Sequence, residues 1–164
     1  MRILGVDPGS RMTGVGIIEV NGDRVHPVYY GAIKAGSGEF TERLGTIFSG
    51  LQQLIKEHRP DEAAIETVFV AHNAASAIKL GQARGAAVCA AISCKIPVSD
   101  YSPRSIKQAI AGRGGADKTQ VQYMVGILLG IKDPIQDDAA DALAVALCHQ
   151  ATSQTLARMA MMQG

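Results

Sequence analysis

Residues 2–20 read RILGVDPGSRMTGVGIIEV and contain two short apolar runs that are separated by a polar turn. The runs at 2–7 and 14–20 have the length and composition of buried strands. The dipeptide Asn21-Gly22 follows the second run and is typical of a two-residue hairpin turn. A third run, at 25–33, comes directly after this turn. The three runs therefore predict an antiparallel meander.

Downstream of the meander, the sequence alternates between helical and strand patterns. Apolar residues recur every three or four positions from Phe40 to Ile55, which predicts an amphipathic helix that ends before Pro60. Further strands are expected at 62–67 and 96–101, and further helices at 73–94, 103–111, 118–129 and from 137 onward. This order predicts an α/β protein, in which helices flank a mixed five-stranded sheet with antiparallel and parallel strands.

Length and composition predict one folded domain over residues 1–164. The chain is 47% hydrophobic and has a net charge of +1, which excludes intrinsic disorder. Its 18 glycines indicate close approaches between backbone segments and many tight turns. We expect only the tail after about Ser153 to fray.

The cysteines and the apolar runs bear on the cellular location. The 3 cysteines are odd in number and lack C-x-x-C spacing, so neither a disulfide framework nor a zinc site is predicted. The first apolar run ends at Asp7 and is too short for a signal peptide, and no run approaches the ~20 apolar residues of a membrane span. A cytoplasmic protein with free thiols and no membrane partner is expected.

Four acidic residues occupy prominent positions in the predicted elements. Asp7 ends the first strand, Glu66 lies near the end of the fourth, and Asp138 and Asp141 share one face of the last helix. Taken singly, each fits an ordinary role as a turn residue, a surface charge or a helix-dipole partner. If the two strands pair centrally and the helix packs at the same end of the sheet, the four carboxylates repel one another unless cations bind.

The chemistry of these four side chains favours particular metals. Oxygen ligands without His or Cys suit Mg²⁺, with Mn²⁺ able to substitute. Two such ions ~3.5–4 Å apart promote in-line displacement at phosphorus by activating water and stabilising the leaving oxygen. The sequence therefore predicts metal-dependent hydrolysis at phosphorus.

Four strings carry a resemblance to a known family: ILGVDPGSRMTGVGII, AIETVF, NAASAIKLGQARG and DDAADALA. They resemble the motifs of the bacterial RuvC family of crossover (Holliday) junction endodeoxyribonucleases, and the likeness extends from Arg2 to about Gln150. The string KLGQARG is the most specific of them. DPGS followed by TGxG also occurs in other ribonuclease H-like and actin-like proteins.

The resemblance implies a ribonuclease H-like fold and a homodimer that nicks two strands of a four-way DNA junction in recombination and repair. It also implies cooperation with the junction-processing proteins RuvA and RuvB. The positions that it implies are the metal ligands Asp7, Glu66, Asp138 and Asp141, the lysines Lys107 and Lys118 near the cut phosphate, and Phe69, an aromatic that contacts unstacked bases at the junction centre.

Charge is unevenly distributed along the chain. Residues 70–118 carry seven basic and two acidic side chains, which indicates a segment that faces DNA. Arg113 lies in a glycine-rich loop whose backbone can approach phosphate, and Arg84 extends the basic track or has a structural role. Asp137 is expected to cap the last helix rather than join the metal site. The lone His149 is expected to be a packing or surface residue.

Three other functions compete with junction cleavage. Asp7-Pro8-Gly9 followed by Thr13-Gly14 also fits an actin-like or sugar-kinase ATPase, but that architecture needs two domains. A non-catalytic junction-binding module and a plain ribonuclease H of the same fold are the others. Magnesium-dependent nicking of junctions separates all three from a resolving nuclease.

Overall fold

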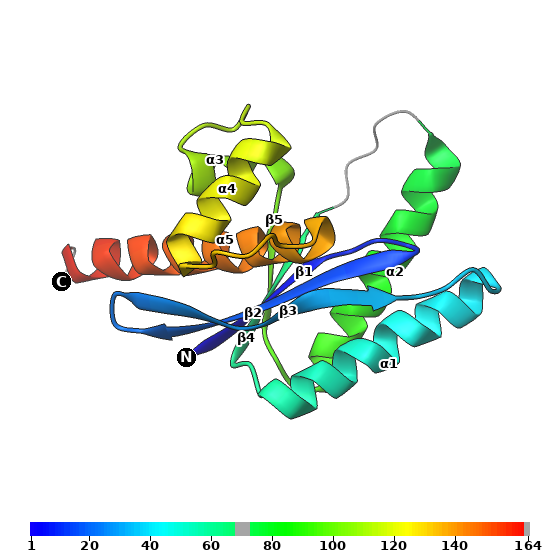
Figure 1. Ribbon diagram of the computed structural model, residues 1–164. Coiled ribbons are helices and arrows are strands. Elements are labelled where there is room, and N and C mark those ends of the chain that lie inside the picture. The colour runs from blue at the N-terminus through cyan, green and yellow to red at the C-terminus, as the bar shows by residue number, and fades with distance from the viewer. Residues whose placement is uncertain (68–72, 163–164) are drawn as a thin grey trace.

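The computed structural model describes residues 1–67 and 73–162, and these residues form one sheet of five strands (Figure 1). The strands are β1 (Arg2–Asp7), β2 (Met12–Asn21), β3 (Arg24–Lys34), β4 (Glu62–Glu66) and β5 (Val98–Tyr101). Their order across the sheet is β3-β2-β1-β4-β5. β1, β2 and β3 form an antiparallel meander, whereas β4 is parallel to β1 and β5 is parallel to β4. The predicted mixed sheet is therefore confirmed.

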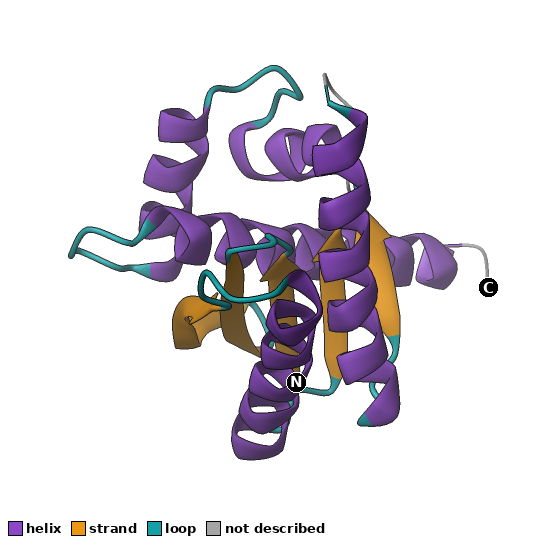
Figure 2. Ribbon diagram, turned by 90° about the vertical axis from the view of Figure 1, so that its right-hand side faces the viewer, coloured by secondary structure: helices purple, strands orange, loops and turns teal. Residues whose placement is uncertain are grey.

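Helices cover both faces of this sheet (Figure 2). They are α1 (Phe40–His58), α2 (Ala74–Ser93), α3 (Pro103–Ala111), α4 (Lys118–Leu129) and α5 (Asp137–Met162). α1 and α2 pack against each other on one face. α5 crosses the other face, and α3 and α4 pack against α5.

The alternation of side chains along β1 determines which face Asp7 occupies. Leu4 and Val6 are buried in the core on the side of α1 and α2, whereas Ile3 is buried on the side of α5. Successive residues of a strand point to opposite faces. Asp7 therefore points to the same face as Ile3 and Gly5, toward α5.

α5 lies very close to the sheet because glycines face it. A Cβ atom on Gly5 would be 2.1 Å from the backbone oxygen of Ala142, and one on Gly14 would be 2.0 Å from the backbone oxygen of Asp138. Gly16 is crowded by the same helix. No side chain fits in these gaps, so the glycine content of this sheet sets the height of α5 above it.

Hydrogen bonds of a buried histidine fix the position of α5 relative to β4 and β5. The side chain of His149 is almost completely buried. Its Nε2 lies 2.6 Å from Oε2 of Glu62 at the start of β4, and its Nδ1 lies 2.9 Å from the hydroxyl of Tyr101 on β5. Of the two roles expected for His149, packing and surface, the structure shows the packing role. These directional bonds hold α5 in one register against the two strands.

The tail after Ser153 is helical, because α5 continues to Met162. No glycine or proline interrupts the segment 137–162. The hydroxyls of Thr152 and Thr155 donate to carbonyls one turn back in the helix, which satisfies them without a tertiary partner. Within the described residues, no helix combines the length and the apolar character needed to cross a membrane.

Candidate active site

The ends of β1 and β4 bring two carboxyl groups together. Val6 and Ile65 are paired across these parallel strands, so Asp7 and Glu66 follow at the same edge. Ala64 is buried on the α5 side, and Glu66, two residues later, points to that same face. The side chains of Asp7 and Glu66 are hydrogen-bonded to each other. Such a bond requires that one of the two carboxyl groups holds a proton.

Burial and negative neighbours keep this proton in place. Burial raises the pKa of Asp7 to about 8, and the charges of Glu66, Asp141 and Asp138 add to the effect. Burial also raises the pKa of Glu66, although the hydrogen bond with Asp7 acts in the opposite direction. At neutral pH, therefore, Asp7 holds the proton and donates it in a hydrogen bond to Glu66.

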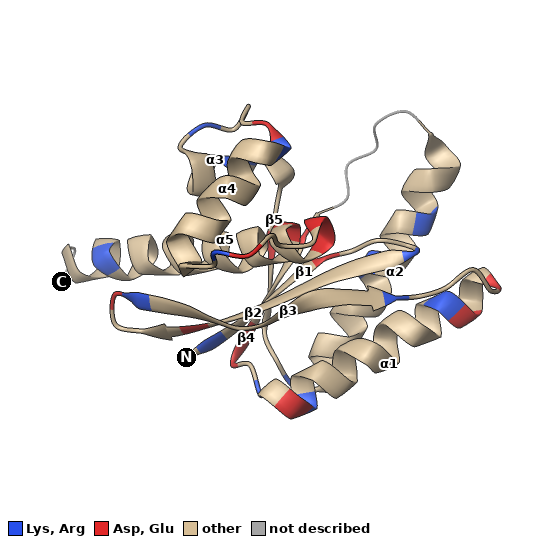
Figure 3. Ribbon diagram, viewed as in Figure 1, with Lys and Arg blue, Asp and Glu red and all other residues tan. Residues whose placement is uncertain are grey.

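The start of α5 lies across the same edge of the sheet. Gly14 is the β2 residue paired with Asp7, and the backbone of Asp138 packs directly on Gly14. Asp141 follows about one turn later, with a half-buried side chain. Figure 3 shows acidic residues gathered where α5 begins beside the end of β1. We call Asp7, Glu66, Asp138 and Asp141 the acidic cluster.

Two lysines flank the acidic cluster. Lys118 Nζ lies 2.8 Å from Oδ2 of Asp141 and 3.6 Å from Oδ2 of Asp137, and the hydrogen bond to Asp141 raises the pKa of Lys118. The positive charges of Lys107 and Lys118 act to lower the pKa of Glu66. Both lysines line a hollow of about 260 Å³ together with Glu66 and Asp141. Cationic and anionic side chains thus face one another across a space open to a ligand.

The donor atoms of the acidic cluster fit a hard divalent cation. All four side chains offer carboxylate oxygens, and neither His nor Cys lines the adjoining hollow. Within residues 1–67 and 73–162, no three Asp, Glu, His or Cys side chains lie in an arrangement that could hold a metal ion. Asp7 and Glu66 instead lie close enough to share a proton. A bound cation would displace that proton and relieve the repulsion that raises the pKa of Asp7.

Two predicted DNA-facing arginines have partners within the protein. The guanidinium of Arg84 forms an ion pair with Asp100 on β5, which supports the structural alternative for this residue. Arg113 donates a hydrogen bond of 2.7 Å to Oε1 of Gln120. Neither side chain lines the hollow beside the acidic cluster. Phe69 lies outside the described residues.

Asp137 does not cap α5 as expected. It is the first residue of the helix, and its carboxylate accepts a hydrogen bond of 3.1 Å from Nε2 of Gln122. The same carboxylate is the more distant partner of Lys118. Asp137 therefore links α5 to α4, because both its partners lie on the neighbouring helix.

Sequence inspection missed Arg104. This side chain lies on α3, one turn before Lys107, and lines a second hollow that adjoins the first. The spacing of three between the two cations was the available signal. The surroundings of Arg104 depend on how the loop at 112–115 folds, and no sequence pattern gives the position of that loop.

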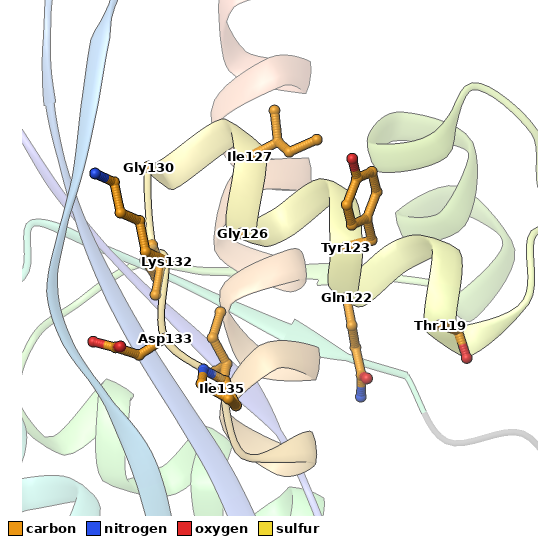
Figure 4. A pocket seen from close by; sticks show the side chains of 11 residues that line it. Thr119, Gln122, Tyr123, Gly126, Ile127, Gly130, Lys132, Asp133 and Ile135 are labelled. Atoms are coloured by element: carbon orange, nitrogen blue, oxygen red, sulfur yellow. The ribbon is translucent and has the colours of Figure 1, made fainter.

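Another hollow, of about 640 Å³, lies on α4 (Figure 4). It is bounded by the segment that leads from α4 to α5, and Tyr123, Ile127 and Ile135 contribute apolar surface to it. None of the four carboxylates of the acidic cluster lines it. This recess is thus separate from the candidate active site.

The fold and the acidic cluster together define a class of protein. A mixed sheet of this order, with carboxylates at the ends of two central strands and on the helix packed over them, is a ribonuclease H-like architecture. Such a site suits metal-assisted hydrolysis of phosphodiesters.

Comparison with known proteins gives the family. The model of the family "Crossover junction endodeoxyribonuclease RuvC" matches residues 3–149. The RuvC of Xanthomonas oryzae pv. oryzae is 53% identical over 160 residues, which cover 94% of this chain and 92% of that protein. The chain belongs to the RuvC family of crossover junction endodeoxyribonucleases.

Solved structures agree with this assignment. Thermus thermophilus RuvC, in complex with a Holliday junction substrate, matches with a TM-score of 0.88 and 34% identity, covering 94% of this chain and 96% of that one. The yeast mitochondrial Holliday junction resolvase Ydc2 matches with a TM-score of 0.68 at 13% identity, covering 95% of this chain and 82% of that one. This second similarity shows a shared fold.

Proposed function

We propose that this chain resolves four-way (Holliday) DNA junctions in recombination and repair by two symmetric nicks, each made by metal-dependent hydrolysis of a phosphodiester. The observation that carries the proposal is the acidic cluster, in which carboxyl groups from the ends of two central strands and the start of α5 lie beside two lysines. Membership of the RuvC family supplies the substrate class, because the Thermus thermophilus relative is described with a Holliday junction bound.

We assign the acidic cluster as the ligands of Mg²⁺, two ions per site, with Mn²⁺ able to substitute. When bound, such ions supply an activated water and stabilise the leaving oxygen of an in-line displacement. Asp7 and Glu66 hold their positions through the sheet, and Asp138 and Asp141 through the close packing of α5. The protein's own contribution is a rigid, partly desolvated set of oxygen donors.

The two lysines act on the DNA rather than on the metal. Lys107 and Lys118 line the hollow beside Glu66 and Asp141, where a phosphate would neutralise their charges. In the protein alone, Lys118 pairs with Asp141 and so occupies part of the space that the substrate needs. Substrate binding therefore exchanges this pair for a contact between Lys118 and phosphate. Phe69 is proposed to contact unstacked bases at the junction centre.

Two symmetric cuts require two active sites related by a two-fold axis, so we propose a homodimer. α2 offers a surface for it. Ile78 and Ile92 are 64% and 60% exposed, and Gly81 and Gly85 lie between them on the same side of the helix. A Cβ atom at either glycine would meet only open space within this chain. Packing inside the protomer therefore does not explain these glycines, whereas close approach of a second helix does.

We further propose that the dimer works in the bacterial cytoplasm with RuvA and RuvB, as the family resemblance implies. Asn73 caps α2, and its side chain accepts hydrogen bonds from two backbone N–H groups.

The decisive experiment incubates the protein with a synthetic mobile four-way junction and Mg²⁺. We expect paired nicks in opposed strands, and no nicking by Asp7→Asn or Glu66→Gln proteins that still bind the junction. Asp23→Asn, which changes an exposed carboxylate in the turn after β2, is the matched control and should nick normally. Binding without nicking on junctions of several sequences contradicts the proposal. Cleavage of RNA–DNA hybrids with none of junctions would indicate a ribonuclease H instead.

A further inference from the structure

A second hollow adjoins the one beside the acidic cluster. It measures about 650 Å³ and is lined by Ser102, Pro103, Arg104, Lys107, Gly114 and Gly115. Pro103 and Lys107 also line the hollow that contains Glu66. The two hollows therefore meet at α3, and a chain lying in the first can continue past Lys107 into the second.

The second hollow has the charge that suits an anion. Arg104 and Lys107 lie three residues apart on α3, on one side of the helix. No acidic residue lines this hollow. Across residues 1–67 and 73–162, neither cation has a hydrogen bond or an ion pair through its side chain. Arg84 and Arg113, in contrast, are already engaged by Asp100 and Gln120.

The glycine loop after α3 is fitted to the side chain of Arg104. A Cβ atom on Gly114 would be 2.7 Å from Cγ of Arg104 and 3.2 Å from its Nε. The loop backbone therefore lies directly against the arginine stem and limits its movement, which lowers the entropic cost of binding. At Gly115 a Cβ atom would meet nothing within 4 Å, so the hollow stays open to a ligand that approaches the backbone.

We propose that this second hollow binds the DNA strand next to the bond that is cut, and that Arg104 contacts a phosphate adjacent to the scissile one. The proposal rests on the proposed function, because the scissile phosphate must lie beside the acidic cluster. A planar guanidinium held against a loop can bind two phosphate oxygens at once. Lys107 would then lie between two successive phosphates and contact the strand where the hollows meet.

Two measurements test the proposal: junction binding by Arg104 variants, and their binding to junctions with single uncharged phosphates. We compare Arg104→Gln with wild type for junction binding in EDTA, where no nicking occurs. Arg59→Gln is the control, since Arg59 is exposed and lies beyond the opposite end of the sheet. Arg104→Gln should weaken binding about tenfold and reduce the slope of log K against log salt by about one. Arg59→Gln should change neither quantity.

Junctions in which one phosphate is uncharged show which phosphate Arg104 contacts. Junctions carry one methylphosphonate at successive positions on either side of the cleaved bond. At one adjacent position the penalty of Arg104→Gln should disappear, because that phosphate no longer has a charge for the arginine to bind. The Arg104→Lys protein should bind with an affinity between those of wild type and Arg104→Gln. A penalty that is the same at every position, or no penalty at all, overturns the proposal.

A second variant acts without removing the arginine. Gly114→Ala places a methyl group where the Arg104 side chain lies, and it should reproduce a large part of the binding loss without changing net charge. Wild-type binding by this variant would contradict the fitted arrangement. Nicking of the unmodified junction by the wild-type protein is measured in parallel. If the wild-type protein does not nick the junction, the proposed function is wrong. If it nicks the junction but Arg104→Gln binds as tightly as wild type, only the proposal for the second hollow is wrong.

Discussion

The proton shared by Asp7 and Glu66 makes the stability of the metal-free protein fall as pH rises from about 4 to about 8. The folded state keeps a proton on Asp7 up to about pH 8, whereas the unfolded chain releases it near 3.8. Between these values the folded state binds more protons than the unfolded state, so the free energy of unfolding falls as pH rises. Asp7→Asn removes the titrating group, and its amide can still donate a hydrogen bond to Glu66.

The size of the effect follows from the same pKa. The pKa of Asp7 lies about four pH units above its ordinary value, and each unit corresponds to ~1.4 kcal/mol. If Asp7 alone held the proton, ionising it in the folded state would cost about 6 kcal/mol. Glu66 shares the proton, so the cost of ionisation is divided between the two carboxyl groups and is smaller than this limit. We therefore expect Asp7→Asn to stabilise the metal-free protein by about 2–4 kcal/mol at pH 9.

Urea unfolding in EDTA at pH 5, 7 and 9 measures this difference. The difference between the wild-type and Asp7→Asn proteins should be small at pH 5, grow as pH rises to about 8 and then level off. Asp23→Asn should follow the wild type throughout. Mg²⁺ should restore stability to the wild type at pH 8 and should have less effect on Asp7→Asn. An Asp7→Asn protein that is no more stable than wild type at pH 9 would refute the shared-proton account.

Three further substitutions probe the remaining parts of the site and the dimer. Gly14→Val should destabilise the protein by about 1–3 kcal/mol and abolish nicking, because the valine side chain would meet the backbone of Asp138. Unfolding and nicking assays measure these effects, and normal nicking would contradict the prediction. Lys118→Gln should change stability by less than about 1 kcal/mol, since the ion pair between Lys118 and Asp141 is half exposed. The same substitution should reduce the single-turnover rate of nicking on a bound junction, and an unchanged rate would exclude a phosphate contact. Gly85→Arg should give a folded monomer by light scattering at micromolar concentration, and a persistent dimer would show that α2 is not the interface.

Much of the fold was accessible from the sequence because its signals are local. The alternation around Asp7 and the helical spacing of Asp138 and Asp141 each lie within one element. That the three residues meet was also predictable, because strands of this order pair centrally. Their distance from one another was not predictable, since it depends on Gly14 letting α5 touch the sheet.

The basic residues were harder to assign for a physical reason. A lysine or arginine is available to DNA only if no acidic neighbour holds it, and that neighbour is usually distant in sequence. Arg84 is held by Asp100 across the fold, whereas Arg104 is left without such a partner and is buttressed by a loop ten residues later. Sequence spacing could not separate these cases, and only Arg84 of the two was predicted to face DNA.

The buried hydrogen bonds of His149 fix α5 at a point about three turns along the helix from the carboxylate of Asp138. His149 lies eleven residues after Asp138 in one uninterrupted helix, a span of ~16 Å at 1.5 Å per residue. Several alanines lie between these points and form no directional bonds, whereas His149 is held by its bonds to Glu62 and Tyr101. The position of the carboxylates at the start of α5 therefore depends partly on Glu62 and Tyr101. Natural variation at these two positions would tune the reaction centre, although neither residue belongs to the acidic cluster.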